Sequence, residues 1–275
     1  MIRKVFGASV QGASHIRSGR ECQDSLKKLE KEEDTVILAV ADGHGSDSSP
    51  YSKTGSYAAV NVFCKILEAY LDTYAGQPEM LFTLLKREGD TKIARRIDAE
   101  WKHRILRLHT RSKREIPLDA AGNKDKEAIY RMYGSTLLGL VLTREFLFAF
   151  QLGDGDIVKV SDGGVYSIIE ADKLLGTETH SLCKMESWKK AITFIGKREE
   201  KEQQPVLYML SSDGFSNSYK NDAEFQKTCI EYYNLLKEHG VKAVSDHLGT
   251  WLQETSELGS GDDITVLFAY DMPQD

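Results

Sequence analysis

The stretch VILAVADGHG, residues 36–45, is typical of a buried β-strand that ends directly at Asp42. A second apolar run reaches Asp213 in VLYMLSSDG, and Asp262 opens a third run in DDITVLFAY. Carboxylates at the tips of buried strands are costly in free energy unless a partner neutralises their charge. A divalent metal ion would neutralise several of them at once, so these stretches together indicate a metal site at one end of a sheet.

The composition is that of an ordinary globular protein. Hydrophobic residues make up 41% and charged residues 28% of the 275 residues. The net charge of -6 argues against a general nucleic-acid binder. The N-terminal segment lacks the continuous apolar core of a secretion signal, and no apolar run is long enough to span a bilayer. We therefore expect a cytoplasmic protein that binds neither nucleic acid nor membrane.

Short runs rich in valine, isoleucine, leucine and phenylalanine predict the strands. The expected strands cover residues 5–10, 36–41, 136–142, 146–152, 157–161, 165–169, 206–211 and 264–270. Residues 143–145 alone join the third of these strands to the fourth, and so short a link permits a hairpin but no crossover helix. At least part of the sheet is therefore expected to be antiparallel.

The helices are expected in two blocks. The first block begins with a helix over residues 50–73, with Ser49 as its N-cap and Pro50 at its first position. Apolar residues at helical spacing continue over residues 78–108. The second block consists of two helices, one on either side of Gly240.

The order of these elements predicts the fold class. Strands and helices do not alternate regularly along the chain, which argues against a doubly wound parallel sheet. A sheet core with helices packed on its outer faces, an α+β fold, fits this order better. The polar stretch over residues 112–126 is interpreted as a loop, so residues 1–275 are expected to form a single domain.

Several common catalytic motifs are missing from the sequence. It has no cysteine followed six positions later by arginine, no GxxxxGKS/T phosphate loop, no HExxH pair and no GxSxG elbow. The four cysteines lie far apart and lack zinc-binding spacing, so we expect free thiols. Any chemistry therefore depends on the aspartates.

Four aspartates occupy turn-like positions at strand ends: Asp24, Asp42, Asp213 and Asp262. If they converged without a cation, each pair about 4 Å apart would repel by roughly 4 kcal/mol at a surface-like dielectric constant. Two divalent ions would balance the four charges, and oxygen donors without cysteine or histidine select Mg²⁺ or Mn²⁺ over zinc. For any one of these residues alone a simple turn is the better explanation, but the set favours a metal site.

Short motifs also occur in an order that resembles a known family. They are DGHG at 42–45, GST at 134–136, LGDGD at 152–156, SSDG at 211–214 and GDDITV at 261–266. In these motifs the chain is similar to the metal-dependent serine/threonine protein phosphatases of the type 2C class. The resemblance spans residues 20–267 and implies a four-layer α-β-β-α sandwich, in which two antiparallel sheets are flanked by helices.

The resemblance also implies a binuclear site for Mn²⁺ or Mg²⁺ at one end of that sandwich. Asp42 would bridge the two ions, and Gly43 would lend its backbone carbonyl. Asp213 and Asp262 would hold one ion, and Asp24 would reach metal through water.

Three further residues match family positions with known roles. Asp154 matches an aspartate that helps to hold a third, more loosely bound ion. Arg20, four residues before Asp24, is placed like the arginine that grips the substrate phosphate. His44 is placed like the proposed general acid, which would protonate the departing oxygen.

The sequence departs from the family pattern at three places. Gln23 stands where most members carry glutamate or asparagine, and a neutral amide brings less charge to a metal site. Asp156 stands where the family has arginine, and Arg17 competes with Arg20 for the phosphate-binding role. None of these departures removes a residue expected to bind metal directly.

The resemblance therefore implies a signalling enzyme, a phosphoprotein phosphatase that hydrolyses phosphoserine and phosphothreonine monoesters by attack of a metal-bridging hydroxide. Its partners would be phosphorylated protein substrates and a cognate serine/threonine kinase. Gln23 supports one alternative, a catalytically weak regulatory module of the same fold that binds a phosphoprotein or a kinase. A metal-dependent hydrolase of small phosphates is a second alternative.

Overall fold

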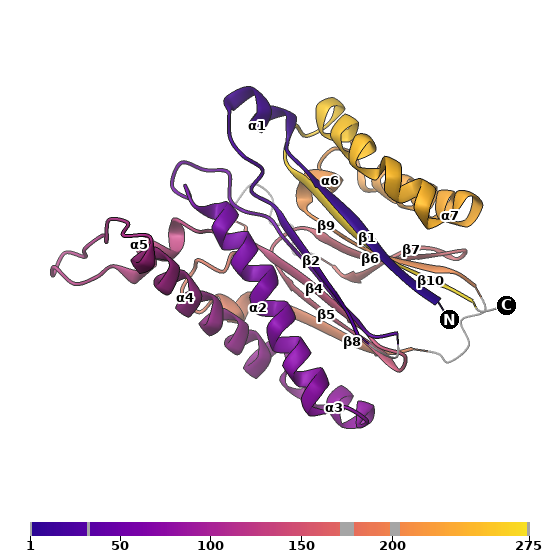
Figure 1. Cartoon of the computed structure of the whole chain (residues 1–275), viewed down its shortest axis with the longest axis horizontal. Helices are drawn as coiled ribbons and strands as arrows, with labels where there is room; N and C mark the ends of the chain where they lie inside the picture. The colour runs from indigo at the N-terminus through magenta and orange to yellow at the C-terminus, as the bar shows by residue number, and fades with distance from the viewer. Residues whose placement is uncertain (1, 32–33, 171–178, 199–203, 274–275) are drawn as a thin grey trace.

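The chain folds into two stacked β-sheets with helices on both outer faces (Figure 1). The structure is a computed structural model that describes residues 2–31, 34–170, 179–198 and 204–273. The first sheet contains β1 (Ile2–Val10), β6 (Asp156–Ser161), β7 (Gly164–Ile169), β9 (Val206–Ser211) and β10 (Ile264–Met272). The second sheet contains β2 (Ser25–Glu30), β3 (Val36–Ala41), β4 (Leu137–Leu142), β5 (Phe146–Leu152) and β8 (Ile192–Lys197).

Each of the two sheets contains five strands. Their orders are β1-β10-β9-β6-β7 and β2-β3-β4-β5-β8. All the described pairings are antiparallel. The α+β, four-layer α-β-β-α sandwich expected from the sequence is therefore confirmed.

The helices cover the two outer faces unequally. They are α1 (Ala13–Ser18), α2 (Ser52–Thr73), α3 (Pro78–Glu88), α4 (Ala94–Arg111), α5 (Lys126–Arg131), α6 (Asp213–Ser216) and α7 (Asp222–Leu258). Figure 1 shows α2 to α5 on the side of the second sheet and α7 on the side of the first. Among the described helices, none has the length and apolar character needed to cross a membrane.

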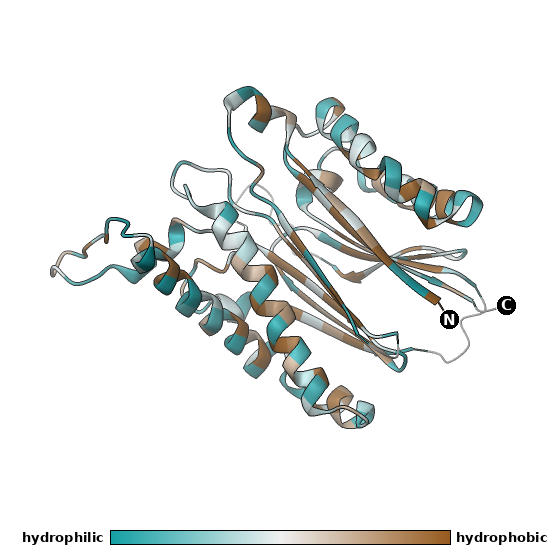
Figure 2. Cartoon of the chain, viewed as in Figure 1, coloured by the Kyte–Doolittle hydropathy of each residue, from teal (hydrophilic) through white to brown (hydrophobic). Residues whose placement is uncertain are grey.

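Hydrophobic residues recur along the strands and on the helices that cover the sheets (Figure 2), and their buried side chains form three clusters. One cluster lies between the second sheet and α2, α3 and α4, one between the two sheets, and one between the first sheet and α7. All residues of β3 and of β9 are buried, because each of these strands has neighbours on both faces. This burial explains why VILAVA is continuously apolar rather than alternating.

Helix α2 begins two residues later than the sequence predicts. Its first residue is Ser52 and its N-cap is Tyr51, so the expected cap at Ser49 and first position at Pro50 were wrong. The Oγ atom of Ser49 instead donates a hydrogen bond to the carbonyl oxygen of Arg131 at 2.8 Å. The side chain that could have capped the helix therefore ties this turn to the end of α5.

Two strands, β2 and β8, were not predicted from the sequence. Both lie at edges of the second sheet, and both are partly exposed. Edge strands often carry lysine and other polar residues that protect them from further pairing, so they lack a continuous apolar run. The predicted break at Gly240, by contrast, is confirmed by its φ of 75° and ψ of 169° inside α7.

A buried ion cluster joins the two sheets at the end where β10 finishes. Asp271 of β10 is fully buried. Its carboxylate accepts hydrogen bonds from Nε of Arg3 at 2.6 Å and from Nη2 of Arg3 at 2.8 Å. Arg198, which follows β8 of the other sheet, donates to the same carboxylate from Nη2 at 2.6 Å. Its Nη1 donates to the carbonyl oxygen of Thr143 at 2.8 Å. Asp271 therefore forms ion pairs with two arginines and connects both sheets.

Candidate metal centre and active site

The opposite end of the sandwich collects carboxylates, beginning with two from the second sheet. Ser25 of β2 pairs with Ala41 of β3 in the antiparallel register. Asp24 directly precedes β2 and Asp42 directly follows β3. Because antiparallel pairing places the start of one strand beside the end of its neighbour, these two residues lie together.

The first sheet contributes two more aspartates in the same way. Ser211 of β9 pairs with Val266 of β10, so the end of β9 lies beside the start of β10. Asp213 opens the short helix α6 after β9, and Asp262 lies in the turn before β10. Strands from both sheets therefore deliver aspartates to one end of the molecule.

The aspartates of the two sheets are close enough to affect one another. The Oγ atom of Ser212 donates to Oδ2 of Asp24 at 2.7 Å, which links the sheets directly. The charge of Asp213 acts on Asp42 and helps to raise the pKa of Asp42. The charge of Asp262 also acts on Asp42. The structure thus brings the predicted strand-end aspartates into one neighbourhood.

The ionised form of these carboxyl groups is disfavoured. Burial raises the pKa of Asp24 to about 7 and that of Asp213 to about 6. Burial also raises the pKa of Asp42 well above its usual range, and the charges of Asp24, Asp213 and Asp262 raise it further. Burial likewise raises the pKa of Asp262. A nearby cation would reverse these shifts, because it would favour the charged carboxylates.

The oxygen donors are of the kind that a divalent cation prefers, although they do not form a complete coordination shell. Among the residues that the structure describes, no three acidic, histidine or cysteine side chains form a compact metal-binding group. Two buried oxygens, Oδ1 of Asp24 and Oε1 of Gln23, nevertheless have no hydrogen-bond partner in this part of the chain. Oxygen ligands, mutual repulsion and unpaired buried acceptors together match the preferences of Mg²⁺ and Mn²⁺.

Gly43 and Asp154 border this group. A Cβ atom at Gly43 would lie 2.6 Å from the backbone oxygen of Gln23, so the turn after Asp42 has room for glycine alone. Asp154 accepts a hydrogen bond from Oγ1 of Thr179 at 2.8 Å, and its charge contributes to the raised pKa of the neighbouring Asp213. Both residues therefore lie beside the aspartates at this end of the sandwich.

Asp156 stands where the family pattern has arginine, and its charge affects a cysteine on helix α7. It begins β6, and its charge adds to burial in raising the pKa of the Cys229 thiol on α7. Asp156 therefore acts toward the helix layer outside the first sheet.

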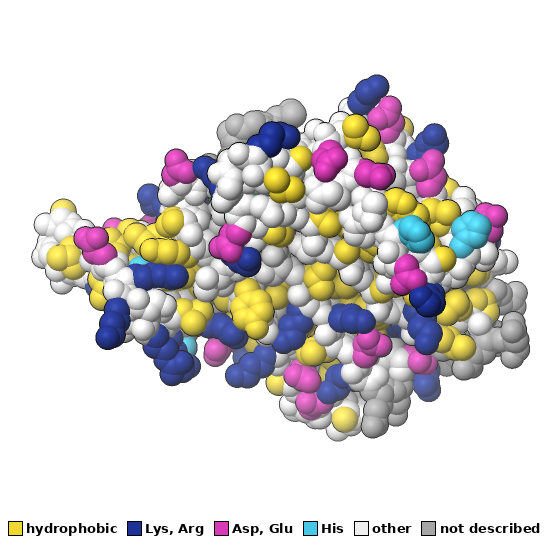
Figure 3. Space-filling view, turned by 45° about the horizontal axis from the view of Figure 1, so that its top comes forward, with side chains coloured by type: hydrophobic (Ala, Val, Ile, Leu, Met, Phe, Trp, Pro, Cys, Tyr) yellow, Lys and Arg dark blue, Asp and Glu magenta, His cyan; other side chains and the backbone are white. Residues whose placement is uncertain are grey.

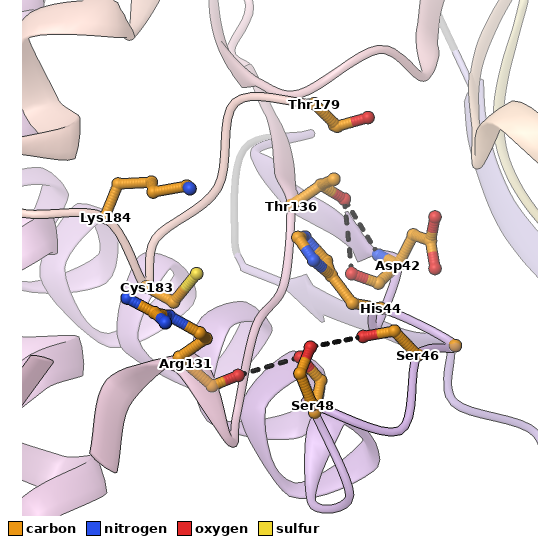
Figure 4. Close-up of a pocket in the computed structure, with 11 residues that line it drawn as sticks. Asp42, His44, Ser46, Ser48, Arg131, Thr136, Thr179, Cys183 and Lys184 are labelled. Atoms are coloured by element: carbon orange, nitrogen blue, oxygen red, sulfur yellow. Dashed lines mark hydrogen bonds between the residues drawn. The ribbon is translucent and has the colours of Figure 1, made fainter. Parts of the chain in front are cut away.

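His44 lies on the pocket side of the turn that follows β3. Its backbone amide donates to the carbonyl oxygen of Gly134 at 3.0 Å. A Cβ atom at Gly134 would come within 3.0 Å of Nδ1 of His44, so this glycine makes room for the imidazole. Figure 4 shows the ring facing the pocket and the carboxylate of Asp42 turned away from it.

Both candidate phosphate-binding arginines lie at this end of the molecule. The Nη2 atom of Arg20 contacts Oδ1 of Asp47 at 2.8 Å, and Nη1 donates to the carbonyl oxygen of Gly45. Arg17 belongs to α1. Its Nη2 lies 3.8 Å from the point where a Cβ atom would stand on Gly261, the residue before Asp262. Arg20 thus approaches the loop after β3, and Arg17 the turn before β10.

Two further residues of this site carried no clear signal in the sequence. Asp263 is buried and accepts hydrogen bonds from the backbone amides of Gly12 at 2.6 Å and Gln23 at 2.7 Å. Its Oδ1 also lies 2.9 Å from Nδ1 of His15. The other ring nitrogen of His15 lies 3.8 Å from Oδ1 of Asp262. The pair His15 and Asp263 therefore fixes the turn that carries Asp262.

Replacing His15 by alanine should weaken Mn²⁺ binding by roughly 10- to 100-fold, the usual effect of removing a residue that supports a metal ligand. The reason is that Asp262 and Asp263 would lose the imidazole that holds their turn. Calorimetric titration with Mn²⁺ measures the effect, and His247→Ala, an exposed change on α7, serves as the control. Equal Mn²⁺ affinity in wild type and His15→Ala would remove this supporting role.

The overall architecture has many structural relatives. The catalytic domain of the serine/threonine phosphatase PstP, in complex with two manganese ions, is 14% identical, with 97% of each chain covered and a TM-score of 0.59. RsbX in complex with magnesium is 14% identical over 98% of this chain and 94% of the other, with a TM-score of 0.52. PppA of Pseudomonas aeruginosa is 16% identical over 98% and 97%, with a TM-score of 0.55. These likenesses show that the chain shares the fold of these three proteins.

The family follows from a match over most of the sequence. The family model described as Protein phosphatase 2C matches residues 11–253. The chain belongs to the protein phosphatase 2C family, which confirms the resemblance seen in the motifs. Comparison with curated proteins gives no significant match.

Proposed function

We propose that this protein is a metal-dependent phosphatase that hydrolyses phosphoserine and phosphothreonine in proteins. The observation that carries the proposal is the convergence of aspartates from both sheets, buried at Asp24 and half-buried at Asp42 and Asp213, each with a raised pKa, at one end of the sandwich. Family membership supports the same activity. The manganese ions of PstP and the magnesium of RsbX support the choice of cation.

Asp42, Asp213 and Asp262, with the carbonyl of Gly43, would hold two Mn²⁺ or Mg²⁺ ions. Asp24 would act through water, and its buried Oδ1 is available for that contact. When bound, the ions would lower the pKa of a coordinated water and neutralise charge on the phosphoryl group. Asp154 would help to hold a third ion.

His44 and Arg20 are the catalytic residues of this proposal. His44 faces the pocket beside Asp42, and a protonated imidazole can donate a proton to the departing oxygen. Arg20 can bind phosphate oxygens in a bidentate manner. Its present contact with Asp47 is an exposed ion pair, which contributes little stability, so a phosphate dianion can displace it. Arg17 is the alternative for this role.

The test is release of inorganic phosphate from a phosphothreonine peptide, an aryl phosphate and a nucleotide, each with Mn²⁺ and with chelator. We expect turnover of the peptide and the aryl phosphate that chelator abolishes and added Mn²⁺ restores. Hydrolysis of the nucleotide in preference to the peptide would instead indicate a hydrolase of small phosphates.

A catalytically weak regulatory module of the same fold is the second candidate. Gln23 replaces a residue that is usually glutamate or asparagine, and the described side chains form no compact metal-binding group. In that case the folded protein would bind the phosphopeptide without metal-dependent turnover. The same assay therefore separates the two functions.

The proposed activity implies functional partners and a location. Phosphorylated proteins would be the substrates, and a serine/threonine kinase that modifies the same proteins would be the cognate partner. Both would meet this phosphatase in the cytoplasm.

A further inference from the structure

A hollow of about 550 Å³ lies beside the proposed site. An aspartate lines one side of this hollow, and basic residues line the side across from it. Asp42 and His44 line one wall, together with the loop at Gly45 and Ser46. The residues on the far side include two cations, Arg131 and Lys184. Figure 4 shows the side chain of Lys184 lining the hollow on the side across from Asp42.

A buried ion pair fixes the backbone at Lys184. The Nζ atom of Lys102 on α4 donates to the carbonyl oxygen of Lys184 at 2.8 Å and to Oδ1 of Asp98 at 2.7 Å. The hydroxyl of Ser187 donates to the same Asp98 oxygen. Lys102 and Asp98 are both buried. The chain segment that presents Lys184 is therefore anchored on the helix layer.

Arg131 is anchored in its backbone and exposed at its head group. It ends α5, and its carbonyl oxygen accepts the hydrogen bond from Ser49. Its Nη2 lies 3.7 Å from Oε1 of Glu127, and both side chains are at least half exposed. Such a long, exposed contact is weak, so the guanidinium can turn to an anion in the hollow.

The positive charge continues beyond this hollow. A second hollow of about 350 Å³ shares Thr179 and Lys184 with the first and is also lined by Lys189 and Lys190. Glu186 offsets Lys189 through a contact of 2.7 Å. The face drawn in Figure 3 carries basic and acidic side chains side by side, and the whole chain has a net charge of -6. The basic residues that line these two hollows therefore form a local positive region on a chain that is negative as a whole.

We propose that Lys184 and Arg131 form a subsite that selects phosphorylated substrates with an acidic residue close to the phosphorylated one. This inference rests on the proposed phosphatase function. An extended peptide advances about 3.3 Å per residue, so a side chain one to three positions from the phosphorylated residue reaches a hollow beside Asp42. Complementary charges of this kind set the choice of partner and the rate of encounter.

Matched phosphothreonine peptides test the subsite. One set carries glutamate at positions one to three residues before or after the phosphothreonine, and the other carries glutamine at the same positions. We expect wild-type kcat/KM with Mn²⁺ to be roughly fivefold or more higher for the best glutamate peptide than for its glutamine partner. The variant Lys184→Gln/Arg131→Gln should lose this preference and keep wild-type turnover of an aryl phosphate.

Two further variants make the result specific. Lys242→Gln, an exposed change on α7, should keep the preference for glutamate. Lys184→Glu should prefer peptides with lysine at the position where wild type prefers glutamate. A preference that persists in the double variant, or a wild type that hydrolyses aryl phosphate without preferring glutamate, would overturn the subsite and leave the proposed function intact. If neither peptide nor aryl phosphate is hydrolysed, the proposed function fails, and the same comparison of peptides by binding affinity decides the subsite.

Discussion

The variant Asp42→Asn is expected to lose phosphatase activity by roughly a thousandfold or more, because removing metal-assisted stabilisation costs several kcal/mol in the transition state. Asp42 is the residue on which the charges of Asp24, Asp213 and Asp262 all act. It is therefore the carboxylate that we propose would hold both ions. Phosphate release from a phosphothreonine peptide with saturating Mn²⁺ measures the effect.

The same variant should melt at a higher temperature than wild type when chelator is present. The folded-state pKa values of Asp24 and Asp213 are raised to about 7 and about 6, and that of Asp42 is raised as well. A carboxyl group with a raised pKa in the folded protein stabilises it fully only below its unfolded pKa, about 4, and this stability is lost as pH rises through the folded value. Removing one charge relieves the penalty.

The advantage of Asp42→Asn in chelator should therefore be small near pH 4 and should grow between about pH 4 and about pH 7. Asp246→Asn, an exposed change on α7, controls for a general effect of charge. Unchanged activity, or an apo variant that is less stable than wild type at pH 7, would contradict the repulsion among these carboxylates.

The variant Asp271→Ala should destabilise the protein by about 3–5 kcal/mol, the usual cost of removing one partner from a buried ion pair. Arg3 and Arg198 would both remain buried without the carboxylate that pairs with them. The melting temperature should fall by on the order of 10 °C. Thermal unfolding followed by circular dichroism measures this change.

Activity per folded molecule should survive Asp271→Ala at low temperature. Asp271 lies near the end of β10 away from Asp262, and at about 3.3 Å per residue the two are more than roughly 20 Å apart. Asp246→Ala, which removes an exposed partner of Lys242, should change the melting temperature little. A similar small effect in both variants would show that the buried cluster does not hold the sheets together.

The fold could be predicted where burial leaves a continuous apolar run. The strand VILAVA has neighbours on both faces, so every residue is apolar and the strand is evident. The edge strand SLKKLE, by contrast, pairs on one side only and is half-buried or exposed along its length. Its strand character comes from hydrogen bonds to β3 that the sequence does not display.

The start of α2 was misplaced for a related reason. Ser49 has the chemistry of an N-cap, but its hydroxyl bonds to the carbonyl oxygen of Arg131, more than 80 residues further along the chain. Local sequence preferences are overridden by such tertiary contacts.

The sequence predicts the acidic residues of the candidate site. It does not predict the residues that hold them in place. Asp42, Asp213 and Asp262 each lie at an apolar strand end, and antiparallel pairing brings those ends together. His15 lies in a short helix, with Asp263 as its partner 248 residues away. A contact of that separation depends on the pairing of β1 with β10, which no local pattern reveals.

The most direct test of a metal site at the strand ends is calorimetric titration of the wild-type protein and Asp42→Asn with Mn²⁺. We expect the wild type to bind two ions per chain, the number present in PstP. Asp42→Asn should lose most of this binding, because the carboxylate of Asp42 would bind both ions. A variant that binds Mn²⁺ with wild-type stoichiometry and affinity would contradict the assignment of Asp42 and of the metal centre built around it.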